Sequence, residues 1–476
     1  MADLEATSKA EDLTFFFGHP DATFDKGKMK PFFLPNRTLL DSLKYGARGA
    51  GKFIVVGQKG SGKTALARYL AETTKSKLVW NLNVREPFFS RSVGQLGAYE
   101  SEIELVLVNL ILSSLANLVM ARKSDFSEAA TKNLERNLHV SLAEHFQKVL
   151  KASKVKTRFF ELDLDLVLKA EKTAFVDYGA DKYAESLGLC FSEKPGLILL
   201  DDIDDLFLGA EQEGYGRFVE GLCRAARTIN TVFEERIHFL IFLKYGVFRL
   251  FFDSPKDYDK LRPFITLLEW DRQGLEDALR KRVRTRFPKY TGDDPLEAVM
   301  PNHRPEEVKE VLDFFIRLCA GGPRDVIDLG NRAIELAGEP VLRPENLAKA
   351  EEGFSRERLN LLHSEYGFRY PRIQELVEMC FSGRPAEWTR ANLLKFLEID
   401  VLGNGRTSRA FDKVEYFLTA TPERLLKHLF SVGFLGYTVG GAADPVFVLR
   451  DPNGSALGKA TRFVVHPAYR HTLGCT

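Results

Sequence analysis

Residues 57–64 combine glycines, a lysine and a hydroxyl at the spacing of a phosphate-binding loop. They read GQKGSGKT and match the pattern GxxxxGK[ST] at every fixed position. Glycines let backbone N–H groups approach phosphate oxygens, and the N-terminus of a following helix favours an anion. We expect Lys63 to reach the β- and γ-phosphates of ATP and the Thr64 hydroxyl to bind Mg²⁺. The predicted nucleotide contacts are Gly57, Gln58, Lys59, Gly60, Ser61, Gly62, Lys63, Thr64 and Ala65.

An apolar run that ends in two carboxylates supplies the partner of this loop. The stretch LILLDDIDDLF at 197–207 predicts a buried strand followed by Asp201 and Asp202. Carboxylates at the carboxyl ends of parallel strands lie where ligands bind. We expect Asp201 to hold Mg²⁺ and Asp202 to orient or deprotonate the attacking water. The alternative, a buried strand that meets a solvated acidic turn, is disfavoured by the presence of the loop.

The elements around these motifs predict an α/β fold with a parallel sheet. A strand at 52–56, a helix at 65–74 and a second strand at 77–84 follow each other in the order of a βαβ unit. The acidic motif comes about 130 residues after the loop, a long interval for a compact core. We therefore expect a helical insertion at about 98–180. Further strands are predicted at 237–243 and 265–269.

The predicted organisation has four parts. They are an N-terminal lead-in (1–50), a P-loop ATPase core (51–270), a small helical lid (271–365) and a C-terminal winged-helix-like domain (366–476). In the last part, helices are expected at 373–381, 392–398, 410–418 and 422–432, and strands at 446–450 and 462–466. Thr421 and Pro422 are a good N-cap and first-turn pair for the last of these helices.

Together, the loop and the acidic motif resemble the AAA+/STAND group of P-loop ATPases. The stretch DDIDDL at 201–206 is most similar to the origin-recognition/Cdc6-like branch, and the segments FFGHPDATFD, KPFFLPNRTLLDSL and KFIVVGQKGSGKTAL resemble bacterial orphan P-loop ATPases. The resemblance implies a polar sensor at Lys244, after the strand HFLIFL, and a second sensor at Arg324, in the helix start GGPRD. The alternatives are a solvated strand-end lysine and an arginine paired with Asp325 or Asp328.

One position departs from the pattern of active AAA+ enzymes. They mostly carry glutamate at the second acidic position, where this chain has Asp202. The shorter side chain favours slow turnover and a nucleotide-held switch of the STAND type. If the protein forms rings, an arginine from a neighbouring subunit should complete the site. The sequence does not choose among the candidates, which are Arg217, Arg224, Arg227 and Arg236.

The helix expected at 422–432 has a mixed character. Four apolar residues share one face, and Arg424, Lys427 and His428 are expected to lie off it, as in a DNA-recognition helix. However, residues 371–476 contain 13 Lys or Arg against 10 Asp or Glu, so the electrostatic case for duplex DNA is weak. An intramolecular or protein-binding role for this domain is favoured over DNA contact.

Composition bounds the remaining possibilities. The chain has 476 residues, 45% of them hydrophobic, and a formal net charge of +1, which argues against a globally basic nucleic-acid binder. Five scattered cysteines form no CxxC or Cys/His cluster and fit reduced thiols in the cytoplasm. The start of the sequence has no signal-peptide pattern, and no apolar run reaches the roughly 20 residues of a membrane span.

These observations favour one functional hypothesis over two others. The leading hypothesis is an ATP-dependent conformational or assembly switch that hydrolyses ATP slowly, with ATP and Mg²⁺ as cofactors. It binds ATP between core and lid, and it engages sister subunits as a homo-oligomer or a protein partner through the insertion or the C-terminal domain. The alternatives are a DNA-binding, initiator- or loader-like ATPase and an interaction scaffold in which ATP is structural.

Overall fold

A computed structural model describes most of the chain. The described residues are 11–20, 22, 29, 33–34, 37–44, 51–83, 103–135, 180–201, 203, 212–252, 258–300, 304–367, 369–441, 444–448, 450–451 and 454–476. They fall into two compact units. We call Pro35–Gly57 with Lys63–Leu268 the sheet unit, and Met1–Leu34, Gln58–Gly62 and Glu269–Thr476 the lid–wing unit. Among the described residues, no helix is both long and apolar enough to cross a membrane.

The sheet unit is built on a parallel sheet of five strands in the order β2-β3-β4-β1-β5. The strands are β1 (Ile54–Gly57), β2 (Leu78–Asn83), β3 (Gly196–Asp201), β4 (Ile237–Lys244) and β5 (Ile265–Leu267). Parallel strands are usually covered on both faces and therefore read as continuous apolar runs. β4, with the sequence IHFLIFLK, is buried at every residue except Lys244 at its end. The predicted α/β fold class with a P-loop sheet is confirmed.

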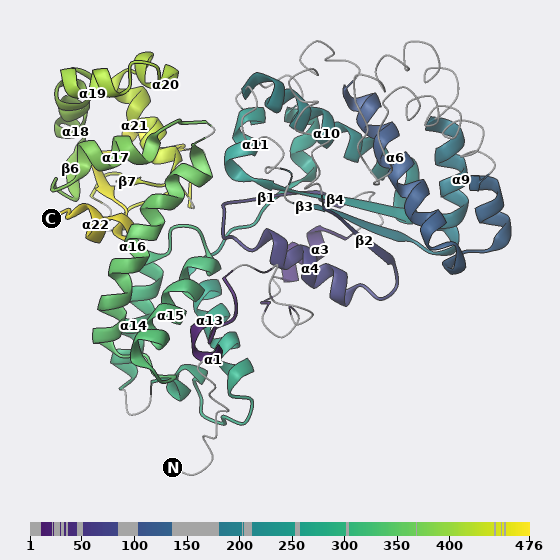
Figure 1. Cartoon of the computed structure of the whole chain (residues 1–476), viewed down its shortest axis with the longest axis horizontal. Helices are drawn as coiled ribbons and strands as arrows, with labels where there is room; N and C mark the ends of the chain where they lie inside the picture. Colours follow the sequence, from purple (N-terminus) through teal and green to yellow (C-terminus); the bar gives the residue numbers. More distant parts are fainter. Residues whose placement is uncertain are drawn as a thin grey trace. The chain divides into compact units, whose positions relative to one another are not determined.

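Helices cover both faces of this sheet (Figure 1). α3 and α4 lie on one face, whereas α6, α9, α10 and α11 lie on the other. The helices of the unit are α3 (Arg37–Ser42), α4 (Lys63–Thr73), α6 (Ile103–Ala121), α9 (Ala180–Glu193), α10 (Gln212–Phe233), α11 (Tyr245–Phe252) and α12 (Tyr258–Leu261). α6 belongs to the predicted helical insertion. The stretch of that insertion at 136–179 lies outside the described residues.

The lid part of the lid–wing unit is a helical bundle with its own core. Its helices are α1 (Glu11–Thr14), α13 (Arg272–Arg286), α14 (Pro305–Leu318), α15 (Pro323–Ala337) and α16 (Pro344–Tyr366). Buried leucines, valines and isoleucines from α13 to α16 meet in one cluster. Prolines at the first position of α14, α15 and α16 fix where these helices begin, because a proline there loses no helical hydrogen bond.

The N-terminal segment is an integral part of this lid core. Phe17 is fully buried in it, at 0% exposure. The backbone N–H of Phe17 donates to Asn331 Oδ1 at 2.8 Å, and Asn331 Nδ2 donates to the carbonyl of Gly18 at 2.9 Å. Arg282 from α13 donates to the carbonyl of Phe17. Position 330 is glycine because a Cβ there would lie 2.8 Å from the Phe17 ring.

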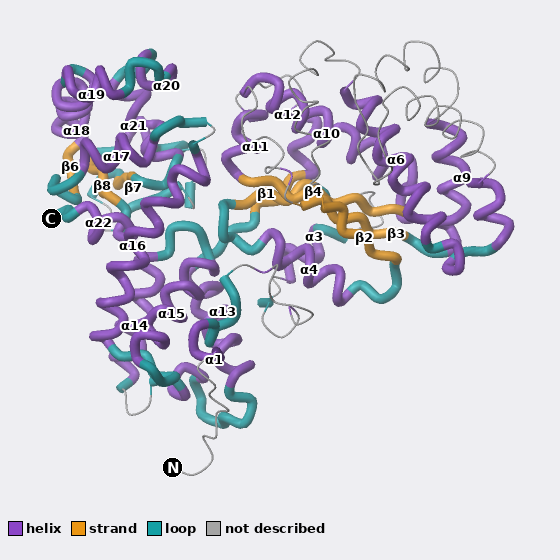
Figure 2. The backbone as a smooth tube through the Cα atoms, viewed as in Figure 1, coloured by secondary structure: helices purple, strands orange, loops and turns teal. Residues whose placement is uncertain are grey.

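The C-terminal part of the unit has the order of a winged helix. Its helices are α17 (Ile373–Phe381), α18 (Arg390–Phe396), α19 (Gly405–Ala410), α20 (Glu415–Leu418), α21 (Pro422–Ser431) and α22 (Pro467–Leu473). Its antiparallel sheet has the order β6-β8-β7, from β6 (Glu387–Thr389), β7 (Leu435–Thr438) and β8 (Arg462–Val465) (Figure 2). These helices and this small sheet lie in the stretch for which a winged-helix-like domain is predicted.

Two of its elements were wrongly predicted. The apolar run at 446–450 is not a strand and makes only an isolated bridge from Val446 to Tyr437. The strand that forms the hairpin with β8 is β7 instead. It was not predicted because it contains Gly436, and glycine has a low propensity for strands. A Cβ at Gly436 would lie 2.5 Å from the Phe447 ring, so packing requires glycine there. The helix predicted at 410–418 is divided between α19 and α20.

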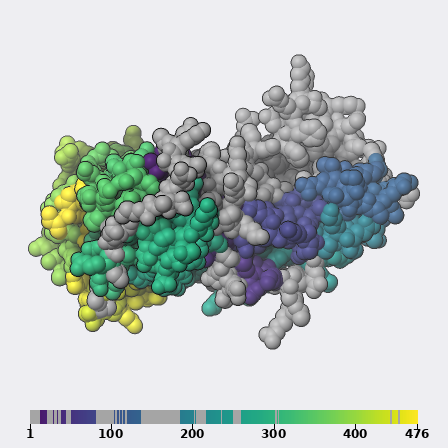
Figure 3. Space-filling model, turned by 90° about the horizontal axis from the view of Figure 1, so that it is seen from below, coloured from purple at the N-terminus to yellow at the C-terminus, as the bar shows by residue number. Residues whose placement is uncertain are grey.

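The C-terminal helix α22 is shared by the two parts of the lid–wing unit. Ala468 belongs to the lid core, whereas Tyr469 and Leu473 belong to the core of the winged helix. The backbone N–H of Thr472 donates to Ser355 Oγ in α16 at 3.1 Å. In the space-filling view, the yellow C-terminal residues pack directly against the green residues of the same unit (Figure 3). α22 therefore joins the lid to the wing.

His466 caps this helix and makes its stability sensitive to acid. Its Nδ1 accepts from the backbone N–H of Ala468 at 3.2 Å, and burial, then Arg358 and Arg470, lowers its pKa from 6.5 to about 3. Below about pH 6.5 the unfolded chain binds a proton at this histidine, whereas the folded chain does not. The free energy of unfolding therefore decreases as the pH is lowered, until the pH reaches the pKa of the folded state.

We expect His466→Asn to make the free energy of unfolding less dependent on pH in the acidic range. Asparagine can still cap the helix but does not titrate, so the slope should decrease by about 1.4 kcal/mol per pH unit below the unfolded pKa. Urea unfolding of the variant and the wild type from neutral pH to about pH 5 measures the slope. His471→Asn, on the exposed side of the same helix, is the control. Parallel slopes for His466→Asn and wild type would contradict this assignment.

Candidate functional site

The loop 57–64 joins the end of a buried strand to the start of a helix, as the motif predicts. β1 ends at Gly57, and α4 begins at Lys63. Between them, Gly60 and Gly62 adopt φ values of +83° and +93°, a region that favours glycine. The N–H of Ser61 donates to the Gln58 carbonyl at 3.1 Å and closes a turn within the loop. The backbone thus leads directly into the N-terminus of α4.

The lysine of the motif is buried and turned back on the loop. Lys63 Nζ donates to the carbonyl of Gly57 at 2.9 Å. The adjacent Thr64 and Ala65 are half-buried in the first turn of α4. A buried ammonium next to a helix N-terminus creates a positive local field. The loop is therefore suited to bind an anion of high charge, such as a polyphosphate.

Asp201 and Lys244 lie at the same edge of the sheet as this loop. Gly57 at the end of β1 pairs in register with Lys244 at the end of β4. Asp201 ends β3, the other neighbour of β4, in register with Asn83. All three positions are at the carboxyl ends of parallel strands, where ligands of open α/β sheets bind. Asp202 lies outside the described residues.

No protein-only metal site exists among the residues that the structure describes, because no three His, Cys, Asp or Glu side chains gather at one point. Mg²⁺ does not need such a cage, since it is usually held by one or two side chains together with substrate phosphates and water. The Thr64 hydroxyl and the Asp201 carboxylate are donors of that kind. The donor set therefore fits a magnesium–nucleotide complex.

The four arginines considered as donors to a neighbouring subunit have different environments. Arg224 pairs with Glu220 in α10, and Arg236 donates to the backbone carbonyls of Phe233 and Val232. Arg227 is exposed and lies 5.7 Å from the Phe264 ring centroid. The side chain of Arg217 lies outside the described part of α10. Arg227 is thus the most accessible of the three that are described.

In the lid–wing unit, the segment Gln58–Gly62 packs against the turn before α15. A Cβ at Gly321 would lie 2.6 Å from the Lys59 carbonyl oxygen. Gly322 has a φ of +120°, and a Cβ there would lie 3.1 Å from Ser61 Cα. Both glycines are required, because any side chain would push the turn away from the loop. The GGPR sequence therefore allows close contact with the phosphate loop.

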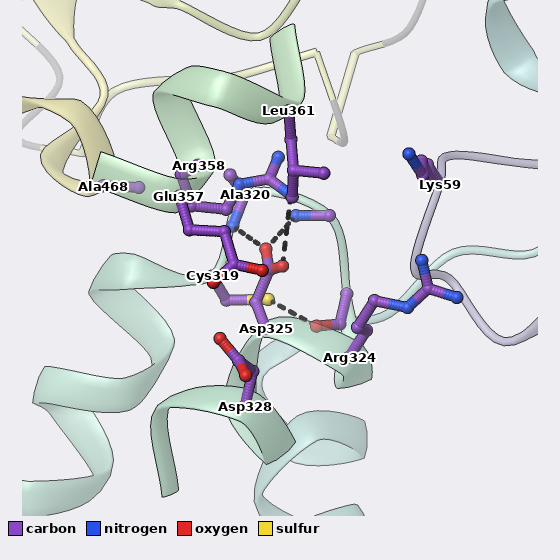
Figure 4. A network of polar contacts seen from close by, with 12 residues as sticks. Lys59, Cys319, Ala320, Arg324, Asp325, Asp328, Glu357, Arg358, Leu361 and Ala468 are labelled. Carbon is purple, nitrogen blue, oxygen red and sulfur yellow. Dashed lines mark hydrogen bonds and ion pairs between the residues drawn. The ribbon is translucent and has the colours of Figure 1, made fainter. Parts of the chain in front are cut away.

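Arg324 follows these glycines and lies next to the loop. Its N–H donates to the Gly60 carbonyl at 3.3 Å, and its Nε donates to the carbonyl of Pro20 at 3.1 Å. Its side chain extends toward the segment that carries Lys59 (Figure 4). The ion pairs considered for Arg324 from sequence are made by other arginines, since Asp325 pairs with Arg358 and Asp328 with Arg332.

Three further side chains hold the loop, and sequence reasoning missed all of them. Trp270 Nε1 donates to the Ser61 carbonyl at 2.7 Å. From the end of α16, the Tyr366 hydroxyl donates to Gln58 Oε1 at 3.1 Å, and Lys59 Nζ donates to Ser364 Oγ at 3.1 Å. Only Trp270 offered a signal. An indole N–H placed directly after a strand usually needs a nearby acceptor.

A buried ion pair lies behind the Gly321–Gly322 turn. The Arg358 guanidinium is 3.3 Å from Asp325 Oδ1 and 3.6 Å from Glu365 Oε1. Burial alone would lower the pKa of Arg358, but the two carboxylates raise it well above its usual value. Removing one partner of a buried pair leaves an uncompensated charge, which costs about 3–5 kcal/mol. Arg358 therefore stays charged although it is buried.

In the winged helix, the two basic residues considered for DNA contact are exposed on α21. Arg424 and Lys427 face solvent, whereas Leu425, Leu426 and Leu429 are buried. His428 turns inward, 4.7 Å from the Tyr370 ring, and burial and then nearby cations lower its pKa to about 4. At neutral pH His428 therefore adds no positive charge to this surface.

A comparison with family models matches the lid. Residues 273–363 match the FunZ-associated C-terminal helical domain. The matched stretch runs from α13 to α16 and thus contains Arg324, Asp325 and Arg358. It is less than half of the chain. No curated protein matches this chain.

Among solved structures, two archaeal proteins are similar to nearly the whole chain. The first is the ORC2 protein of Aeropyrum pernix, in ADPNP–ADP complexes. It is 15% identical, with a TM-score of 0.42, and the match covers 94% of this chain and 95% of that one. The second is Cdc6p of Pyrobaculum aerophilum, at 12% identity, with a TM-score of 0.35 and coverage of 95% and 96%.

Proposed function

We propose that this protein is an AAA+/STAND-type ATPase that binds ATP with Mg²⁺ at the loop 57–64 and acts as a nucleotide-driven switch. The observation that carries the proposal is the continuous path from the buried strand β1, through two glycines at positive φ, to Lys63 at the first position of α4. This path presents backbone N–H groups, a helix N-terminus and a buried ammonium to one anion.

The residues at the sheet edge fit the metal and the reacting phosphate. Thr64 and Asp201 would hold Mg²⁺, which neutralises charge on the β- and γ-phosphates when bound. Lys63 would exchange its bond to the Gly57 carbonyl for phosphate oxygens. Lys244, level with Gly57 in the sheet, would donate to the γ-phosphate or to the attacking water. Asp202 is the residue assigned to orient that water or take its proton.

The switch would operate through the loop itself. Residues 58–62 contact the GGPR turn, the end of α16 and Trp270 within the lid–wing unit. A nucleotide that orders this loop therefore changes the packing of the turn that carries Arg324. Arg324 would add a charge-assisted contact to the terminal phosphate and so favour ATP over ADP. The output of the switch would be the docking of a sister subunit or a protein partner.

Replacing Lys63 tests the central claim. We expect Lys63→Ala to weaken ATP·Mg binding by roughly 100-fold or more, because charge-assisted bonds to two phosphates are lost. Titration of a fluorescent ATP analogue against both proteins measures the affinities. Lys75→Ala, which removes an exposed lysine beyond the end of α4, is the matched control and should bind like wild type. Equal affinity of Lys63→Ala and wild type would refute the proposal.

Turnover separates the switch from a scaffold that holds ATP permanently. Wild type with ATP already bound should convert it to ADP slowly in a single-turnover assay, and Asp202→Asn should abolish the conversion while it retains ATP binding. If wild type also keeps its ATP and forms no ADP, like Asp202→Asn, the result would favour the scaffold.

A further inference from the structure

We infer that Arg358 is a positioning residue for Arg324, and that it links the phosphate loop to the C-terminal helix α22. The inference rests on the proposed function and adds a regulatory connection to it. Arg358 does not contact the loop. It holds the carboxylate that shapes the turn next to the loop, and it does so from a buried place between the lid and the wing.

Asp325 shapes the turn that lies next to the loop. Asp325 Oδ2 accepts from the backbone N–H groups of Ala320 and Gly321 at 2.8 and 2.5 Å. Cys319 Sγ donates to the Gly322 carbonyl at 3.1 Å and closes the same turn (Figure 4). A single carboxylate thus fixes the backbone that delivers Arg324 to the loop.

Arg358 in turn fixes the Asp325 carboxylate. Arg358 Nη1 lies 3.3 Å from Asp325 Oδ1, and the Arg358 side chain is only 5% exposed. Arg324 and Asp325 are neighbours in α15, and their side chains diverge, one toward the segment that carries Lys59 and the other toward Arg358 (Figure 4). Because the two side chains share one turn of backbone, a shift of Asp325 toward or away from Arg358 moves Arg324 as well.

Arg358 also reaches the end of α16, which is the second support of the loop. Its Nη1 lies 3.6 Å from Glu365, between Ser364 and Tyr366 in α16. These two neighbours bond to Lys59 and Gln58 of the loop. Arg358 therefore contacts a carboxylate at two of the three places that hold residues 58–62, namely the GGPR turn and the end of α16.

Tyr469 connects this cluster to the C-terminal helix. The Arg358 guanidinium and the Tyr469 phenol of α22 are buried close enough to each other to interact electrostatically. The same helix is tied to α16, which carries Arg358, because the backbone N–H of Thr472 donates to Ser355 Oγ at 3.1 Å. Tyr469 is fully buried and belongs to the core of the winged helix. A displacement of the C-terminal part of the unit (Ile373–Thr476) would therefore move Arg358 through its contact with Tyr469. A movement of Arg358 would in turn shift Asp325 and Arg324.

Two variants of Arg358 and one of Tyr469 test this connection. Arg358→Met removes the charge at similar side-chain length, and Arg358→Lys keeps the charge but loses the forked guanidinium. Tyr469→Phe removes only a hydroxyl, so this variant should fold even if the Arg358 variants do not. We expect Arg358→Met to lower kcat for ATP about 10-fold with a smaller change in ADP affinity. Arg358→Lys and Tyr469→Phe should lose less. Arg356→Met, at a position whose side chain is 71% exposed on the same helix, should behave as wild type.

The deciding measurement is a double-mutant cycle with Arg324→Ala. If Arg358 acts through Arg324, Arg358→Met in that background should reduce kcat by less than about 2-fold further. An undiminished loss in that background, or variants that lower only the melting temperature and leave kcat and ADP affinity unchanged, would overturn the inference.

Hydrogen exchange keeps the failure of this inference separate from that of the proposed function. The amides of Ala320 and Gly321 should exchange faster in Arg358→Met and Tyr469→Phe than in wild type, without any nucleotide. Wild type that binds no ATP would refute the function, whatever the exchange. ATP binding that depends on Lys63, together with unchanged exchange at these two amides, would refute only the role of Arg358.

Discussion

Phe17→Ala is expected to destabilise the lid–wing unit by about 3–5 kcal/mol, because it removes a whole ring from a closed core. Phe17 is 0% exposed and packs edge-on against Phe16, with ring centroids 5.1 Å apart. The bonds of its backbone to Asn331 and Arg282 remain, so the N-terminal segment cannot collapse freely to fill the cavity. Urea unfolding followed by circular dichroism measures the loss.

The matched control stands two residues away. Phe15 is 41% exposed, and Phe15→Ala should change stability by no more than about 0.5 kcal/mol. Since both variants remove the same ring from the same short segment, their difference isolates burial from aromatic content. Equal losses in the two variants would show that the segment is not packed as described.

Arg324→Ala is expected to lower kcat for ATP by roughly 100- to 1,000-fold, the usual cost of deleting a donor aimed at transition-state charge. ADP affinity should change far less, because ADP lacks the phosphate that Arg324 is proposed to contact. The backbone bond from Arg324 to Gly60 does not depend on the side chain, so the loop should keep its place. Steady-state turnover and ADP titration give the two quantities.

Two variants serve as controls, namely the loss of a different, exposed arginine and a conservative change of Arg324 itself. Arg317 is exposed and stacks 5.5 Å from the Phe314 ring centroid, and Arg317→Ala should turn over like wild type. Arg324→Lys keeps the charge but loses the Nε donor that bonds to Pro20, so an intermediate kcat is expected. If Arg324→Ala has a normal kcat but binds ADP more weakly, the Arg324 side chain does not contact the terminal phosphate of ATP.

Local patterns in the sequence were enough to predict the α/β core. The strand β4 could be predicted because six of its seven consecutive buried residues are apolar, all except His238. The loop could be predicted because each fixed position of its motif is chemically constrained. The order of the strands was not readable from sequence. It arises from register between segments far apart, such as Gly57 with Lys244.

Residues that act through tertiary contacts were not predictable. Arg358 lies in a helix rich in charged residues, and nothing local distinguishes it from the exposed Arg356 two positions earlier. Tyr366 and Trp270 serve the loop through bonds that span more than two hundred positions. The strand β7 was missed because Gly436, demanded by the Phe447 ring, has low strand propensity.

The position of Phe17 has a consequence for how the protein is made. Its hydrogen-bonding partner Asn331 lies 314 positions later in the chain. At synthesis rates of about 5–20 residues per second, roughly 15–60 s pass on the ribosome between the two residues. During this delay three consecutive phenylalanines, Phe15, Phe16 and Phe17, are without their partners in the nascent chain. The lid should therefore fold after translation of α15, and early recognition of the triplet by a chaperone would protect the chain from aggregation.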